Sequence, residues 1–145
     1  MRTKNKYSFD KDFFKIPNVI NSYWAGFWAA DGCVNSADYL EIINLSILDF
    51  EHLQKFANTI KLSKPIRRFK QLGGYSKNCE YCSLTVYSKE WKEDLGKNFG
   101  VIPKKTFLLK PPPLNKQEEI YSYIVGYIDG DGCIGFNKNK TPNIS

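Results

Sequence analysis

Two stretches of this sequence, SYWAGFWAADGC at residues 22–33 and SYIVGYIDGDGC at residues 122–133, share one layout of small, aromatic and acidic residues. Each copy places two small residues four positions apart, on one face of a helix: Gly26 and Ala30, then Gly126 and Gly130. Such a smooth strip lets another backbone approach closely, and this contact would offset the cost of about 1 kcal/mol that glycine has inside a helix. We therefore expect two helices that pack together through these four residues.

Each copy ends in an aspartate followed by glycine, at Asp31 and Asp131. The C-terminal end of a helix carries partial negative charge, so a carboxylate there is disfavoured by a few tenths of a kcal/mol to about 1 kcal/mol. A single Asp-Gly pair would be interpreted as a turn. Two pairs in matched copies indicate converging carboxylates instead, which usually hold a hard divalent cation such as Mg²⁺.

Length and charge limit the classes of protein. A chain of 145 residues is long enough for one domain with a core, or for one small domain and part of another. Lys and Arg outnumber Asp and Glu by 21 to 15, and the net charge of +6 favours a polyanionic partner. The apolar runs fall short of the roughly 20 residues that span a bilayer, and the N-terminus lacks the apolar region of a secretory signal. We expect an intracellular protein that does not enter a membrane.

The four cysteines raise the alternative of a zinc-dependent binding module. Cys79 and Cys82 form one C-x-x-C pair, whereas a closed zinc site needs four ligands. The remaining candidates are His52, Cys33 and Cys133, which lie far away in the sequence. We interpret the cysteines as reduced side chains packed in strands, and His52 as a half-buried or surface residue of a helix.

Helical and extended patterns alternate along the chain. Apolar spacing predicts helices over residues 17–32, 49–62, 89–100 and from 117 onward, with a strand at 39–47 and two strands around Gly73 and Gly74 within 65–88. The three prolines of PPPLN mark a stiff break. The expected division is an N-terminal tail (1–17), a first unit (18–110), a proline-rich linker (111–116) and an incomplete second unit (117–145) with one helix, one strand and a tail.

The repeats WAGFWAADG and IVGYIDGDG resemble the two copies of the motif that names the LAGLIDADG homing endonucleases. The order of elements between the copies, and FGVIPKKTFLLKPPP before the second, are also similar to that family. The resemblance implies an α+β fold: an αββαββα unit with a saddle-shaped antiparallel sheet, then the first helix and strand of a second unit. The sequence departs from the family at Ala29, where Asp129 keeps the usual acid, and in having only residues 133–145 after the second motif.

The family implies site-specific, metal-dependent hydrolysis of double-stranded DNA by a protein encoded in an intron or intein. Asp31 and Asp131 would hold Mg²⁺ or another divalent cation beside the scissile phosphates, and Lys105, or its neighbour Lys104, would assist catalysis. Alternate side chains of the sheet would reach the major groove. The candidate DNA contacts on or near the hairpin are Arg67, Arg68, Lys70, Gln71, Tyr75 and Lys77.

The incomplete second unit also predicts a partner. A second polypeptide or a second copy of the chain would complete the DNA-binding saddle, and the chain by itself is expected to cleave slowly or not at all. The same scaffold also serves non-cleaving roles. A catalytically inactive DNA-binding relic and an RNA splicing maturase therefore remain alternative functions.

Overall fold

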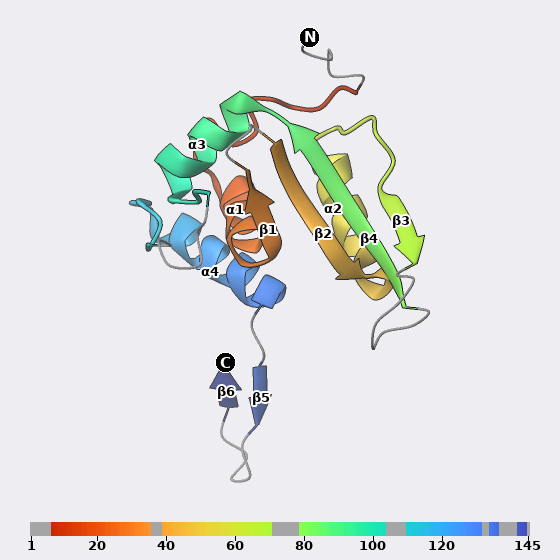
Figure 1. The fold of residues 1–145 in the computed structure, drawn as a ribbon. Coiled ribbons are helices and arrows are strands. Elements are labelled where there is room, and N and C mark those ends of the chain that lie inside the picture. The colour runs from red at the N-terminus through yellow and green to blue at the C-terminus, as the bar shows by residue number, and fades with distance from the viewer. Residues whose placement is uncertain are drawn as a thin grey trace.

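The computed structural model describes residues 7–35, 39–70, 79–103, 110–131, 134–136 and 142–144, and has an α+β fold, as predicted (Figure 1). The helices are α1 (Val19–Asp31), the 3₁₀ turn η1 (Ile47–Asp49), α2 (Phe50–Thr59), α3 (Lys89–Phe99) and α4 (Gln117–Asp131). The strands are β1 (Gly32–Val34), β2 (Tyr39–Ser46), β3 (Arg67–Lys70), β4 (Glu80–Tyr87), β5 (Ile134–Phe136) and β6 (Pro142–Ile144).

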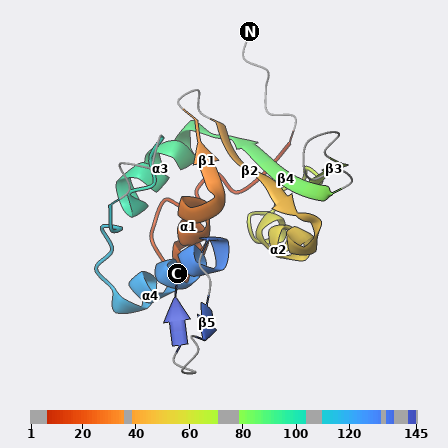
Figure 2. The same cartoon turned by 60° about the horizontal axis from the view of Figure 1, so that its bottom comes forward.

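The first four strands form one antiparallel sheet in the order β1-β2-β4-β3. The sequence pattern predicted β2 and the β3–β4 pair, whereas only the family resemblance implied a strand at β1, which follows directly from α1 because the backbone becomes extended at Gly32. The chain therefore turns from the helix straight into the edge of the sheet. Figures 1 and 2 show α2 against one face of β2 and β4.

The C-terminal residues form a second, two-stranded sheet of β5 and β6, with Ile134 opposite Ile144 and Phe136 opposite Pro142. The sequence interpretation of one strand and a tail was wrong at this point. A lone strand would leave its N–H and C=O groups unpaired, and the returning strand pairs them. In Figure 1 this hairpin lies beyond the end of α4, away from the larger sheet.

The ends of the helices follow from their capping residues. Asn18 and Asn21 form a reciprocal pair at the start of α1: the Asn18 side chain accepts from the Asn21 N–H at 2.9 Å, and the Asn21 side chain accepts from the Asn18 N–H at 2.7 Å. The helix therefore begins at Val19. Ser88 caps α3, and Gly100 ends it in the left-handed conformation, which glycine adopts without steric cost.

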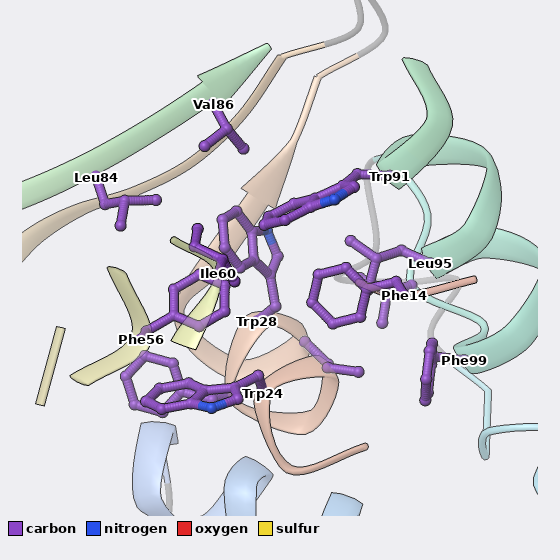
Figure 3. Close-up of a cluster of buried hydrophobic side chains, with 14 of the residues drawn as sticks. Phe14, Trp24, Trp28, Phe56, Ile60, Leu84, Val86, Trp91, Leu95 and Phe99 are labelled. Carbon is purple, nitrogen blue, oxygen red and sulfur yellow. The ribbon is translucent and has the colours of Figure 1, made fainter. Parts of the chain in front are cut away.

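A cluster of aromatic side chains forms the core between α1, α2, α3 and the sheet (Figure 3). Trp28 of α1, Phe56 of α2 and Trp91 of α3 are fully buried and pack mostly edge to face. Leu84 and Val86 of β4 point into the same cluster (Figure 3). This core fixes α1 relative to the sheet, and α1 carries half of the candidate site.

The polar N-terminal segment was predicted to be a tail, but its described residues, from residue 7 onward, pack against the rest of the protein. Phe14 is fully buried in the aromatic cluster, and the Trp91 indole donates to the carbonyl of Asp10 at 2.9 Å. The Asn98 amide donates to the carbonyls of Phe14 and Lys15. Three of the ten phenylalanines, Phe9, Phe13 and Phe14, lie in the first 17 residues, and the burial of Phe14 gives this segment a fixed place.

Candidate functional site

The helices of the two repeated motifs, α1 and α4, lie side by side (Figures 1 and 2). A β-carbon added to Gly26 would collide with the backbone carbonyl of Tyr123, and one added to Gly126 would collide with the carbonyl of Tyr23. The two backbones are thus in direct contact at the glycines. Close approach of this kind requires residues without side chains on both helices.

The contacts between the two helices have an approximate twofold symmetry. Gly26 faces Tyr123 and Tyr127, while Gly126 faces Tyr23 and Phe27, so that each residue number on one side becomes its counterpart on the other when 100 is added or subtracted. The helices run in the same direction, because Gly130 near the end of α4 lies against Ala30 near the end of α1. The motif repeat in the sequence therefore corresponds to a repeat in space.

Both motif aspartates lie at the same end of this helix pair. One carboxylate oxygen of Asp31 is 3.4 Å from the position that a β-carbon of Gly130 would occupy, so Asp31 lies against the residue that precedes Asp131. Asp31 is partly exposed and Asp131 is exposed. Solvent, or a ligand, can therefore reach both carboxylates.

A pocket of about 300 Å³ opens beside the end of α1. Its lining is strongly acidic, with three carboxylates and one imidazole; the lining residues are Phe27, Asp31, Asp49, His52, Asp129 and Gly130. Asp31 comes from α1, Asp129 and Gly130 from α4, and His52 from α2. Three helices therefore meet at this pocket, and α2 adds groups to the site that belong to neither repeat.

A hydrogen-bonded group connects the three helices next to the pocket. The Tyr23 hydroxyl donates to an Asp129 carboxylate oxygen at 2.7 Å and lies 3.1 Å from His52 Nε2. Burial, together with the hydrogen bond and the negative charge of Asp129, raises the pKa of Tyr23 far above its usual range. Burial also lowers the pKa of His52, a shift that the charges of Asp129 and Asp49 oppose. The Tyr23 hydroxyl therefore keeps its proton at neutral pH and can donate it in the hydrogen bond to Asp129.

The carboxylates suit a hard divalent cation only in part. Within the described ranges, no three His, Cys, Asp or Glu side chains converge to hold a metal ion by themselves. Mg²⁺ does not need such a cage, since it is usually bound through one or two carboxylates, with water and substrate phosphates as the other ligands. Asp31 and Asp129 at the pocket supply oxygen ligands of this type. The oxygen donors at the pocket are therefore of the type that Mg²⁺ takes.

The structure places the described candidate DNA contacts of β3 on opposite faces of the sheet. Arg67 is opposite Ser83, whereas Arg68 is opposite the buried Cys82, and its guanidinium lies 3.9 Å from the ring centre of Phe50 on α2. Successive side chains of a strand alternate between faces, so Arg68 and Lys70 share the helix side and Arg67 the outer side. Lys70 pairs with Glu80 at 3.4 Å.

Four further candidates lie outside the described residues: Gln71, Tyr75, Lys77 and Lys105. The same is true of Lys104 and of one member of the proposed zinc set, Cys133. Of the other cysteines, Cys33 and Cys79 are exposed and Cys82 is buried in β4. His52 is half-buried on α2, as the helical pattern indicated.

The places of Asp49 and His52 in the pocket lining, and of Tyr23 beside it, were not predicted from the sequence. Two signals were present. Tyrosine precedes the first motif glycine by three residues in both copies, at Tyr23 and Tyr123, which places it on the same helix face. Asp49 and His52 are three residues apart at the start of α2, so they share a face as well.

Comparison with protein-family models found no match to this sequence, and the search among curated proteins found no relative. In the described part of the chain, none of the helices has both the length and the apolar character that crossing a membrane requires.

Proposed function

We propose that this protein is a homing-type endonuclease that binds double-stranded DNA and hydrolyses a phosphodiester bond with the help of divalent cations. The observation that carries this proposal is the backbone contact between α1 and α4, which brings Asp31 and Asp131 to one end of a helix pair. Sequence resemblance to the LAGLIDADG motif supports the same function. A single Asp-Gly pair is typical of a turn, whereas carboxylates at two matched helix C-termini, where each opposes the helix dipole, favour a ligand-binding role.

The residues at the C-terminal end of the helix pair would have different roles in the reaction. Asp31 and Asp131 would hold Mg²⁺ or a similar cation against the DNA phosphates, and Lys105 remains the candidate for assisting the reaction. When bound, the cation would activate water and stabilise the leaving oxygen. The aromatic contacts of His52 with Trp24 and Phe27 hold α2 against the helix pair and so shape the pocket wall.

The outer face of the sheet is the proposed DNA-binding surface. Arg67 lies over the Phe69 ring at 5.2 Å, and Phe69 stacks on Tyr81 with ring centres 5.8 Å apart, which gives a row of cationic and aromatic groups on that face. Arginine held in this way is pre-positioned for a phosphate or a base edge. The net charge of +6 attracts duplex DNA at longer range.

A second α/β unit is the proposed protein partner, on the outward face of α4. By the twofold relation, Trp24 and Ala25 of α1 correspond to Ile124 and Val125 of α4. The first pair is 7% and 0% exposed, and Trp24 packs against His52 and Phe56 of α2, whereas the second pair is 46% and 50% exposed. A unit like that of residues 18–103, placed by the twofold axis, would bury Ile124 and Val125 in the same manner.

Binding and cleavage are tested together with a library of duplex DNA that is randomised over its centre. The purified chain should retain duplex in preference to single strands, and its affinity should fall steeply with salt concentration, because bound lysines and arginines release counterions. With a second α/β unit supplied, cleaved ends should appear in Mg²⁺ and not in EDTA. Absence of duplex binding by folded protein at low salt would overturn the proposal. Retained binding without divalent-dependent ends would favour the non-cleaving relic.

A further inference from the structure

The twofold relation between α1 and α4 allows each side chain at the site to be compared with its counterpart, and one pair does not correspond. Tyr23 donates its hydroxyl hydrogen bond to Asp129 across the helix pair at 2.7 Å. The counterpart of Tyr23 is Tyr123, and the counterpart of Asp129 is Ala29, which has no polar group. Each helix therefore has the tyrosine, but only α4 has a carboxylate that can accept the hydrogen bond from the tyrosine of the other helix.

The hydroxyl of Tyr123 shows the consequence of this difference. Tyr123 is 5% exposed, and its hydroxyl is buried without a hydrogen-bond partner among the described residues. Burial raises the pKa of Tyr123 to about 12, so this group stays protonated. An unpaired buried hydroxyl costs about 1 to 3 kcal/mol, so the lost contact is not a neutral change.

Asp129 lines the pocket together with Asp31, whereas Asp131 is not part of its lining. One oxygen of the Asp129 carboxylate accepts from Tyr23, which itself is close to His52. Because Asp129 is exposed, its side chain would otherwise be able to rotate into solvent. Tyr23 therefore fixes the direction of a second carboxylate at the Asp31 end of the site, and Ala29 leaves nothing equivalent at the Asp131 end.

We propose that Tyr23 is a positioning residue that holds Asp129 beside Asp31, so that the two cation positions of the site are unequal. This inference rests on the proposed function, since it concerns the cations of that site. The cation position at Asp31 has a second carboxylate, that of Asp129. At the Asp131 position the counterpart of Asp129 is Ala29, which has no carboxylate. The Asp31 position binds a divalent cation more tightly, and hydrogen-bond partners of ligands typically change metal affinity by about 10- to 100-fold.

The test is binding of Mn²⁺ alone to the purified chain, with free Mn²⁺ measured by electron paramagnetic resonance. Tyr23→Phe removes the hydroxyl and keeps the ring, and it should weaken the tighter Mn²⁺ site about tenfold. Tyr123→Phe is the matched control on the opposite side and should leave the Mn²⁺ affinity unchanged. Thermal unfolding of both variants checks that the helix pair remains folded.

A double-mutant cycle separates positioning from a merely structural role. If Tyr23 acts through Asp129, then Asp129→Asn should weaken Mn²⁺ binding at least as much as Tyr23→Phe, and the two changes together should cost no more than Asp129→Asn by itself. Two results would overturn the inference and leave the proposed function intact. One is a Tyr23→Phe variant that binds Mn²⁺ with the affinity of the parent, and the other is an equal loss of Mn²⁺ affinity in Tyr23→Phe and Tyr123→Phe. A parent chain with no Mn²⁺ binding would overturn the inference, and the proposed function would then be decided by the test of DNA cleavage.

Discussion

Gly26 of α1 lies against the backbone carbonyl of Tyr123 of α4 so closely that residue 26 has no room for a β-carbon. The same relation holds between Gly126 and Tyr23, which makes the contact reciprocal. Any side chain at either glycine would push the helices apart. Since Asp31 and Asp131 lie at the end of these helices, the geometry of the candidate site depends on this contact.

Gly26→Ala should destabilise the fold by about 1 to 3 kcal/mol, because the added methyl meets backbone that cannot move aside independently. The loss is expected although alanine favours a helix over glycine by about 1 kcal/mol. Gly96→Ala on α3 is the control, since its nearest neighbour would be Ile102 at 3.7 Å, an ordinary contact. That variant should be at least as stable as the parent. Urea unfolding measures the stability of both variants. Equal stabilities of Gly26→Ala and Gly96→Ala would contradict the close packing of α1 against α4.

Arg67→Ala and Arg68→Ala should have different effects, although the two residues are adjacent. Arg67 is on the proposed DNA face, so its loss should weaken duplex binding and reduce the slope of log affinity against log salt by about 0.9. Arg68 lies over Phe50 on the helix side, so its loss should lower thermal stability and leave the slope unchanged. Titrations at several salt concentrations distinguish them. A lower slope of log affinity against log salt for Arg68→Ala would show that Arg68, on the helix side of the sheet, also contacts DNA, and would contradict the outer face as the binding surface.

Folding stability should fall on acidification because of His52, the only histidine in the chain. Burial lowers its pKa in the folded protein, while the unfolded chain has a pKa near the ordinary value of about 6.5. Below that pH the unfolded chain binds the proton more readily, so the stabilising contribution is present at higher pH and is lost as the pH falls toward the folded pKa. His52→Gln should reduce the stability difference between about pH 7.5 and 5.5, and an unchanged difference would contradict this assignment.

The outward face of α4 should matter for assembly rather than for folding of the chain itself. Ile124→Ser should change folding stability by no more than about 0.5 kcal/mol, since the side chain is already 46% exposed. Its counterpart Trp24 is 7% exposed, and Trp24→Ala should cost about 3 to 5 kcal/mol. Supplying a second α/β unit should raise DNA cleavage in the parent and not in Ile124→Ser. An equal gain in both would exclude this face.

Much of the framework was predictable because its signals are local. The helical spacing of α2 and α3, the β3–β4 pair and the glycine strips of the two motifs each occupy a short window of sequence. β1 has only three residues and is defined by pairing with β2, and Phe14 is buried through contacts with distant parts of the chain. Neither leaves a periodic pattern.

The candidate site shows the same division. Asp31 and Asp131 stand out through repetition of the motif, whereas the hydrogen bond from Tyr23 to Asp129 joins residues that are 106 positions apart. The place of His52 at the pocket depends on how α2 packs against the helix pair, which single-sequence patterns do not encode. Both Arg67 and Arg68 were predicted to contact DNA, although strand alternation places two adjacent residues of β3 on opposite faces of the sheet.

The most direct test of the central claim is sequencing of DNA ends produced from the randomised duplex library by the parent chain, Asp31→Asn and Asp131→Asn, each with the second α/β unit supplied, in Mg²⁺ and in EDTA. Sequencing detects slow cleavage, and salt-dependent binding confirms that each variant still holds duplex. The prediction is that the parent in Mg²⁺ yields ends at a preferred sequence, and that these ends are lost in EDTA and in each variant. Mg²⁺-dependent ends that persist in both variants, or a DNA-binding parent that yields no more ends than the variants, would contradict it.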